Sequence, residues 1–143
     1  MKQRLPKPEE ISRCLEMLFG SAPEVSEAPA VEAAWTATYV TDEDEPVAWC
    51  SFDLPAAAYL GSALSMIPKP GADDAVKEAS LSKMMVSNLY EVANIFSSFF
   101  MGKGTPHLRL VEVEEKVDGP EPLARFSIDI PGYGKGSVSF AAL

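Results

Sequence analysis

A polar stripe on one candidate helix holds the residues that could do chemistry in this sequence. Residues 73–101 contain no internal proline or glycine, and they form the longest candidate helix of the chain. At about 100° per residue, Ser87, Glu91, Asn94 and Ser98 share one face of that helix. Glu91 and Asn94 offer a carboxylate, which accepts hydrogen bonds, one turn from a carboxamide, which donates and accepts them. We assign the candidate chemistry to this face, and the alternative is an ordinary solvated helix surface.

The opposite face of the same helix is apolar and must be buried. The stripe repeats at spacings of three and four and consists of Leu81, Met85, Leu89, Val92, Phe96 and Phe99. We expect it to pack against a sheet, which leaves Glu91 and Asn94 accessible to solvent.

Other candidate sites are weaker. His107 is the only histidine, and no Cys or Asp stands at a spacing that would make it a partner, so we expect a structural or surface role. The glycines of residues 131–136 lack the GK[ST] ending and the helix of a phosphate-binding loop, which favours a hairpin turn. The acidic residues 41–45 lack the ordered ligands of a calcium loop and are typical of a solvated turn.

The elements that must position the stripe can be read along the chain. Pro8, with acidic residues after it, opens a helix that Gly20 ends, and residues 21–30 are expected to form a loop. Alternation predicts a hairpin of strands at 31–39 and 47–52. Asp53 can cap a helix over 56–66, which the prolines at 68 and 70 end, and residues 69–73 form a loop before the long helix. Strands are predicted at 108–113, 123–130 and 137–141.

The order of these elements predicts an α+β fold with an antiparallel or mixed sheet, because the strands come in hairpin-linked runs. Residues 1–143 show no repeat, linker or low-complexity segment, so we expect a single domain. Cys14 and Cys50 are too few for a zinc motif or a disulfide framework and are expected to be core thiols in a reducing compartment.

The charge narrows the choice of partners. The formal net charge of −9 argues against nucleic acid and against an anionic membrane surface, and it favours a partner with a basic patch. The sequence begins with basic residues but no apolar run follows them, and no apolar stretch is long enough to span a bilayer. We therefore expect a soluble cytoplasmic protein.

The run Ser87-x-x-x-Glu91-x-x-Asn94 resembles the signature of the CheC/CheX/FliY family, the phosphatases of the bacterial chemotaxis response regulator CheY. The element order agrees over most of the chain: a short N-terminal helix, a strand hairpin, the helix within DLPAAAYLGSALSMI, the motif helix and C-terminal strands. Only one Glu91/Asn94 pair is found, which is more like the single-motif CheX type. The resemblance implies a CheC-like α+β fold, with the sheet packed against the long motif helix and shorter helices.

By position, the resemblance implies that Asn94 orients the water that attacks an aspartyl phosphate. Glu91 would contact the lysine of the receiver domain, and Ser87, with Ser98, would have a supporting role. A CheY-like response regulator receiver domain is the implied partner, in chemotaxis or two-component signalling. The chain needs no cofactor of its own, since the receiver supplies Mg²⁺. CheX-type relatives form dimers, so a homodimer is also expected.

Two alternatives to a phosphatase remain open. The chain could be a catalytically silent adaptor that binds a receiver or another signalling protein through the same surface. It could also be an interaction or structural domain that shares only the architecture, and that role predicts no receiver binding at all.

Overall fold

The computed structural model describes residues 3–116 and 119–143. Its helices, given by their bounds, are α1 (Pro8–Phe19), α2 (Leu54–Ala63), α3 (Lys69–Glu78), α4 (Lys83–Phe96) and the 3₁₀ turn η1 (Ser97–Phe100). Its strands are β1 (Glu24–Glu27), β2 (Trp35–Val40), β3 (Pro46–Phe52), β4 (Arg109–Glu115), β5 (Ala124–Ile130) and β6 (Gly134–Ala142).

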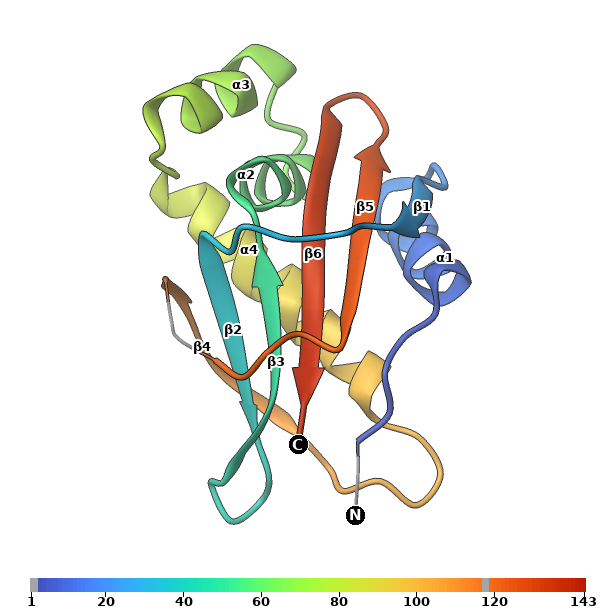
Figure 1. The fold of residues 1–143 in the computed structure, drawn as a ribbon. Coiled ribbons are helices and arrows are strands. Elements are labelled where there is room, and N and C mark those ends of the chain that lie inside the picture. Colours follow the sequence, from blue (N-terminus) through green and yellow to red (C-terminus); the bar gives the residue numbers. More distant parts are fainter. Residues whose placement is uncertain (1–2, 117–118) are drawn as a thin grey trace.

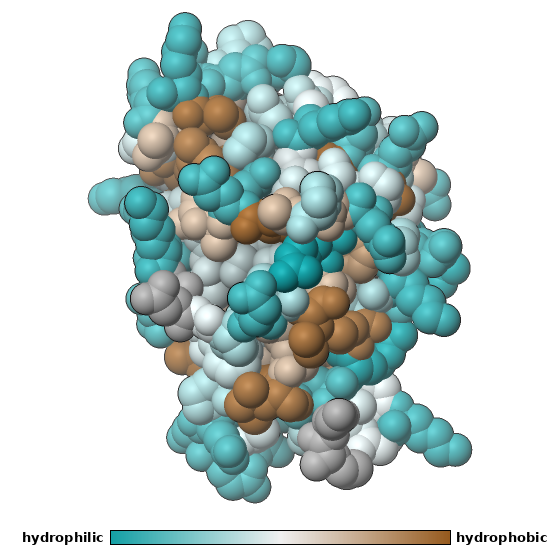
Figure 2. Space-filling model, in the orientation of Figure 1, coloured by the Kyte–Doolittle hydropathy of each residue, from teal (hydrophilic) through white to brown (hydrophobic). Residues whose placement is uncertain are grey.

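The six strands form one sheet in the order β1-β5-β6-β3-β2-β4, and every neighbouring pair is antiparallel. The helices α1, α2 and α4 lie on one side of it (Figure 1). Because β1 and β2 lie far apart in the sheet, as do β4 and β5, their connections run across the opposite face, where residues 28–34 and 119–123 are seen (Figure 1). That face is largely polar, with separate hydrophobic patches (Figure 2). The predicted α+β class with an antiparallel sheet is confirmed.

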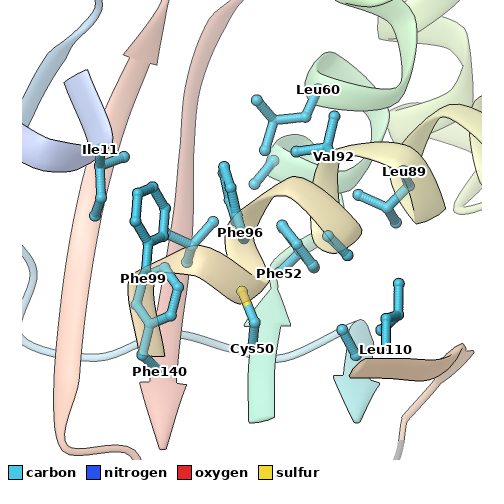
Figure 3. Close-up of a cluster of buried hydrophobic side chains, with 14 of the residues drawn as sticks. Ile11, Cys50, Phe52, Leu60, Leu89, Val92, Phe96, Phe99, Leu110 and Phe140 are labelled. Carbon is cyan, nitrogen blue, oxygen red and sulfur yellow. The ribbon is translucent and has the colours of Figure 1, made fainter. Parts of the chain in front are cut away.

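The core lies between the sheet and α4. Phe96, Phe99 and Phe140 pack with ring centroids 4.9–6.2 Å apart, and Phe52 stacks on Phe96. Figure 3 shows these rings meeting side chains from α1, α2 and the sheet at one cluster. Burying each large apolar side chain contributes about 1.5–3 kcal/mol, so the cluster holds α4 onto the sheet and fixes which face of the helix remains outside.

Most predicted elements form within a few residues of their expected positions. Helix α1 ends at Gly20, as predicted, and the φ of +82° at this residue is the left-handed conformation that glycine adopts most easily. Asp53 caps α2 by accepting the Ala56 N–H at 2.8 Å. The hairpins β2–β3 and β5–β6 form as expected, although β2 begins only at Trp35.

The single helix predicted over residues 73–101 is wrong, because two helices and a 3₁₀ turn occupy that region. Ala79 takes a left-handed conformation at φ +52°, which ends α3, and the Ser82 hydroxyl accepts the Met85 N–H at 3.2 Å and starts α4. A serine side chain competes with helix propagation in this way without any glycine or proline. The loop predicted at residues 69–73 is helical, since Pro70 suits a first helical turn and opens α3.

The loop predicted over residues 21–30 is also partly wrong. Residues Glu24–Glu27 form β1, which pairs with β5 in register from Glu24↔Asp129 to Glu27↔Phe126. Only Val25 of this strand is apolar and partly buried. A four-residue edge strand therefore has too little alternation to reveal itself in the sequence.

Candidate functional site

The exposed face of α4 carries the candidate site. Ser87, Glu91, Asn94 and Ser98 are all exposed, whereas Met85, Leu89, Val92 and Phe96 are buried. The predicted opposition of a buried apolar face and an exposed polar face is therefore confirmed within α4, whereas Leu81 lies before the helix and is partly buried, and the buried Phe99 lies in η1. Glu91 and Asn94 stand three positions apart inside α4, so their side chains are neighbours on its surface, with Cβ atoms about 5–6 Å apart.

The stripe changes character at its C-terminal end. The α-helix ends at Phe96, so Ser98 lies in η1 rather than in the helix that the sequence predicted. Its hydroxyl donates to the Ile95 carbonyl at 3.0 Å, and the neighbouring Ser97 hydroxyl donates to the Asn94 carbonyl at 2.7 Å. The donor of Ser98 is thus used within the turn, and Ser87, Glu91 and Asn94 are the polar residues of the stripe that lie within α4 itself.

The contact with helix α2 fixes the position of α4 along its axis and its rotation about that axis. Gly61 lies so close to α4 that a Cβ at that position would stand 2.6 Å from the Met85 carbonyl oxygen. Asn88 stabilises the same contact between α2 and α4, because its side-chain amide donates to the Gly61 carbonyl at 2.7 Å and to the Ser65 hydroxyl at 2.8 Å. Asn88 lies one turn before Glu91, so this contact determines where Glu91 and Asn94 are presented.

Two grooves flank the stripe. One, of about 430 Å³, borders Glu91 and is lined by Leu81, Lys83, Val86, Ser87, Tyr90 and Glu91. The other, of about 350 Å³, lies between α1 and the end of α4 and is lined mainly by Cys14, Met17, Leu18, Ile95, Ser98 and Phe99. Tyr90, Ile95 and Met17 are exposed large hydrophobic side chains, and Met17 is 82% exposed. The polar stripe thus has exposed hydrophobic side chains on both sides, and this arrangement suits the binding of a protein partner.

The contribution of α1 to this surface could not be found from the sequence. The N-terminal segment is tied to η1, because the Arg4 N–H donates to the Phe100 carbonyl at 3.0 Å and its guanidinium donates to the Phe99 carbonyl at 3.3 Å. The same guanidinium pairs with Glu10 at 2.8 Å, and this hydrogen bond is the main cause that lowers the pKa of Glu10. Contacts over such sequence separations leave no local periodic signal.

His107 has an acidic partner that its sequence spacing did not reveal. Its Nδ1 lies 3.1 Å from Asp42 Oδ1 in the β2–β3 turn, and both side chains are exposed. In the same turn Asp44 pairs with Arg109 at the start of β4. These pairs join the acidic turn to the strand beside it. Within the described ranges, 3–116 and 119–143, no group of three or more His, Cys, Asp or Glu side chains is placed to hold a metal ion.

The burial of both cysteines agrees with the expectation of core thiols. Cys50 is fully buried and Cys14 is partly buried, and burial raises the pKa of both thiols. No helix in the part of the chain that the structure describes is long and apolar enough to cross a membrane.

No protein-family model matches this sequence, and no functionally curated protein matches it. Solved structures do match. The FliM middle domain from H. pylori superposes with a TM-score of 0.54 at 9% identity, covering 94% of this chain and 84% of that one. Thermotoga maritima FliY gives 0.54 at 14% identity, covering 92% and 81%. A chain of the CheX–CheY–BeF3–Mg complex from Borrelia burgdorferi gives 0.53 at 15% identity, covering 91% and 90%.

These identities are too low to transfer an activity, but the superpositions extend over more than nine-tenths of the chain. The fold implied by the sequence resemblance is therefore confirmed: this chain has the fold shared by CheX, FliY and the FliM middle domain.

Proposed function

We propose that this protein regulates a CheY-like response regulator by hydrolysing the aspartyl phosphate of its receiver domain. The observation that carries the proposal is the exposed Glu91/Asn94 pair on α4, at the positions of the CheC/CheX/FliY signature, in a chain with the fold of CheX. One of the similar structures is itself a complex of CheX with CheY. A signalling role of the CheC-like kind fits the fold, and the phosphatase activity is the specific part of the proposal.

In the proposed reaction the Asn94 carboxamide accepts a hydrogen bond from a water molecule and donates one to it, which holds the water in line with phosphorus. The water oxygen bonds to phosphorus as the bond from phosphorus to the aspartyl oxygen breaks. Inorganic phosphate leaves with both protons of the water, as dihydrogen phosphate that equilibrates with solvent, and the receiver regains its aspartate carboxylate. An acyl phosphate is already activated, so positioning the water supplies most of what the reaction needs.

Glu91 has the complementary role of binding the receiver. Its exposed carboxylate, one turn from Asn94, pairs with the lysine ammonium of the receiver's phosphorylation site. The receiver's own Mg²⁺ neutralises the phosphoryl oxygens, so we propose that this chain contributes no metal and no cofactor. Ser87, one turn before Glu91, supports the contact from the groove that both residues line.

A second function, binding without catalysis, is favoured by a specific observation. The FliM middle domain from H. pylori matches the chain as well as the CheX complex does. In that case the same face of α4 would hold a receiver or another signalling protein, and Asn94 would not reach a phosphoryl group.

The deciding experiment measures phosphate release from acyl-phosphorylated receiver domains of the source organism in Mg²⁺, with and without this protein. Acceleration with at least one receiver supports the phosphatase. A parallel pull-down uses the same receivers with and without beryllofluoride as the phosphoryl mimic. Binding without acceleration supports the adaptor, and absence of both overturns the two proposals together.

A further inference from the structure

Three consecutive backbone carbonyls in the last turn of α4 each accept a hydrogen bond from a hydroxyl group. The Ala93 carbonyl accepts from Tyr39 at 2.5 Å, the Asn94 carbonyl from Ser97 at 2.7 Å, and the Ile95 carbonyl from Ser98 at 3.0 Å. The two serines bond within their own turn, as serines near helix ends commonly do. Tyr39 is different, because it reaches this turn from β2, the strand of the sheet that lies between β3 and the edge strand β4.

The Ala93 carbonyl needs a partner because the α-helix ends beside it. In a continued α-helix the Ser97 N–H would bond to the Ala93 carbonyl. That N–H is directed instead at the Asn94 and Ile95 carbonyls, and the chain continues as the 3₁₀ turn η1. Ala93 is fully buried, so water cannot take the place of the lost donor. The Tyr39 hydroxyl supplies that donor.

Tyr39 is held so that it can donate in only one direction. Its side chain is fully buried, and its ring packs against Phe100 with centroids 5.1 Å apart. Burial, with a smaller contribution from the neighbouring Cys50, raises the pKa of Tyr39 well above its usual range. The hydroxyl therefore keeps its proton, and the hydrogen bond to Ala93 persists, throughout the neutral and mildly alkaline range.

We propose that Tyr39 is a positioning residue for Asn94 and acts through the Ala93 carbonyl. The peptide plane that contains this carbonyl leads directly into Asn94, so fixing its direction fixes where the carboxamide leaves the helix. The inference rests on the proposed function, because it assigns Asn94 the task of holding the attacking water. Displacing a reacting group by about 1 Å can reduce a rate on the order of a hundredfold, which makes the end of α4 a determinant of rate.

The test is Tyr39→Phe, which keeps the ring and its contact with Phe100 and removes only the hydroxyl. With a phosphorylated receiver as substrate, we expect kcat to fall tenfold or more while KM stays within about twofold, since the surface that binds the receiver is intact. The control is Ile130→Val, which removes a buried methylene at the far end of β5 and leaves Tyr39 untouched. An equal loss of kcat in both variants, or no loss in Tyr39→Phe, would overturn the inference.

A second readout does not depend on activity and separates this inference from the proposed function. Backbone amide exchange and the NMR signals of the Asn94 side-chain amide are compared in the wild type and both variants. Faster exchange at residues 97–101, with line broadening at Asn94 in Tyr39→Phe alone, supports the positioning role. If even the wild type dephosphorylates no receiver, the phosphatase proposal fails, and the exchange and NMR comparison alone tests the role of Tyr39. Unchanged exchange and an unchanged Asn94 signal would then overturn the role of Tyr39.

Discussion

Asn94 is the residue at which a single substitution should have the largest effect on activity. Asn94→Ala is expected to abolish accelerated dephosphorylation, since the same stripe of α4 has no other exposed carboxamide that could orient the water. An exposed substitution away from caps and core changes stability by less than about 0.5 kcal/mol, so unfolding would not account for the loss. Phosphate release is measured beside Asp74→Ala, an exposed substitution on α3. Wild-type activity in Asn94→Ala would show that the role carried over from the family signature is wrong.

Glu91 should affect binding more than rate. Glu91→Gln keeps the shape of the side chain and removes the charge, so receiver affinity is expected to fall while kcat at saturation changes little. An exposed intermolecular ion pair is screened by salt, so the affinity difference should shrink as ionic strength rises. Titration calorimetry at low and high salt measures this, with Glu78→Gln on α3 as the control. A difference that is independent of salt would contradict the ion pair.

For single residues, the sequence predicts which side chains are exposed better than it predicts the hydrogen-bond partners of buried side chains. The exposure of Ser87, Glu91 and Asn94 follows from helical periodicity alone, because each residue's position on the helix depends only on its neighbours in sequence. The hydroxyl of Tyr39 could not be assigned to Ala93, since the two are joined by the folding of β2 against α4. Alternation in β2 indicates that Tyr39 points inward, but not which carbonyl it meets.

Among the elements, the contact of α2 with α4 should be the most sensitive to a small change. Gly61→Ala places a Cβ against a backbone carbonyl that cannot move alone, and overpacking of this kind typically costs about 1–3 kcal/mol. Gly71→Ala in α3 is a matched control, because its Cβ meets only Ile67 at 3.4 Å and removes the cost of a helical glycine. Urea denaturation should show Gly61→Ala destabilised and Gly71→Ala unchanged or more stable. The reverse order would contradict the close packing.

The cap of α2 gives the fold a dependence on pH. Burial raises the pKa of Asp53, although N–H donors of Ser137 and Ala56 partly oppose this, with Oδ1 accepting from them at 3.0 and 2.8 Å. The folded state therefore binds the proton more tightly than the unfolded state does. The stability that Asp53 contributes should be greatest below the ordinary aspartate pKa of about 3.9 and decline as pH rises through the raised value.

Asp53→Asn should remove that decline, because asparagine can cap a helix but does not ionise in this range. Asp53→Ala should lose the cap, at a cost of about 0.5–2 kcal/mol. Thermal unfolding of the three proteins from pH 4 to 8 checks both expectations. A wild type whose stability relative to Asp53→Asn rises with pH would reverse the inferred sign.

The sequence predicted helix boundaries correctly where a residue with a strong local preference stands at the end of the helix. Gly20 and Asp53 mark their helix ends by backbone conformation and by capping, and both are in place. The break at Ala79 was missed because alanine favours helices, and only the packing of α3 against α2 and the cap at Ser82 favour a turn there. β1 was missed for a related reason, since its pairing with β5 determines its conformation.

For the molecule as a whole, the two sheet edges bear on the expected homodimer. β1 carries Glu24 and Glu27, and β4 carries Glu112 and Glu114, so like charges would oppose each other if two copies paired edge to edge. A hydrogen bond with Glu112 raises the pKa of Glu114, so this repulsion should weaken as pH falls through that raised value.

Self-association should therefore be stronger in mild acid than at neutral pH, and stronger at neutral pH in the variant Glu112→Gln with Glu114→Gln. Sedimentation velocity at high micromolar concentration compares this variant with the wild type and with Glu9→Gln, Glu16→Gln on α1. A wild type that stays monomeric under all these conditions counts against the homodimer. Identical association in the three proteins would exclude the β4 edge as its site.

The segments that cross the open face of the sheet have a consequence for how the chain is made. They exist because the sheet joins strands that are distant in sequence: Glu27 pairs with Phe126, and Cys50 in the middle of the sheet pairs with Phe140. Strands that are distant in sequence pair slowly, because the entropy cost of closing a long loop comes before the strand contacts that offset it can form. Translation at about 5–20 residues per second leaves the inner edge of β3 without β6 for several seconds. During that interval the future centre of the sheet is an open strand edge, so the yield of folded protein should depend on temperature and on chaperones.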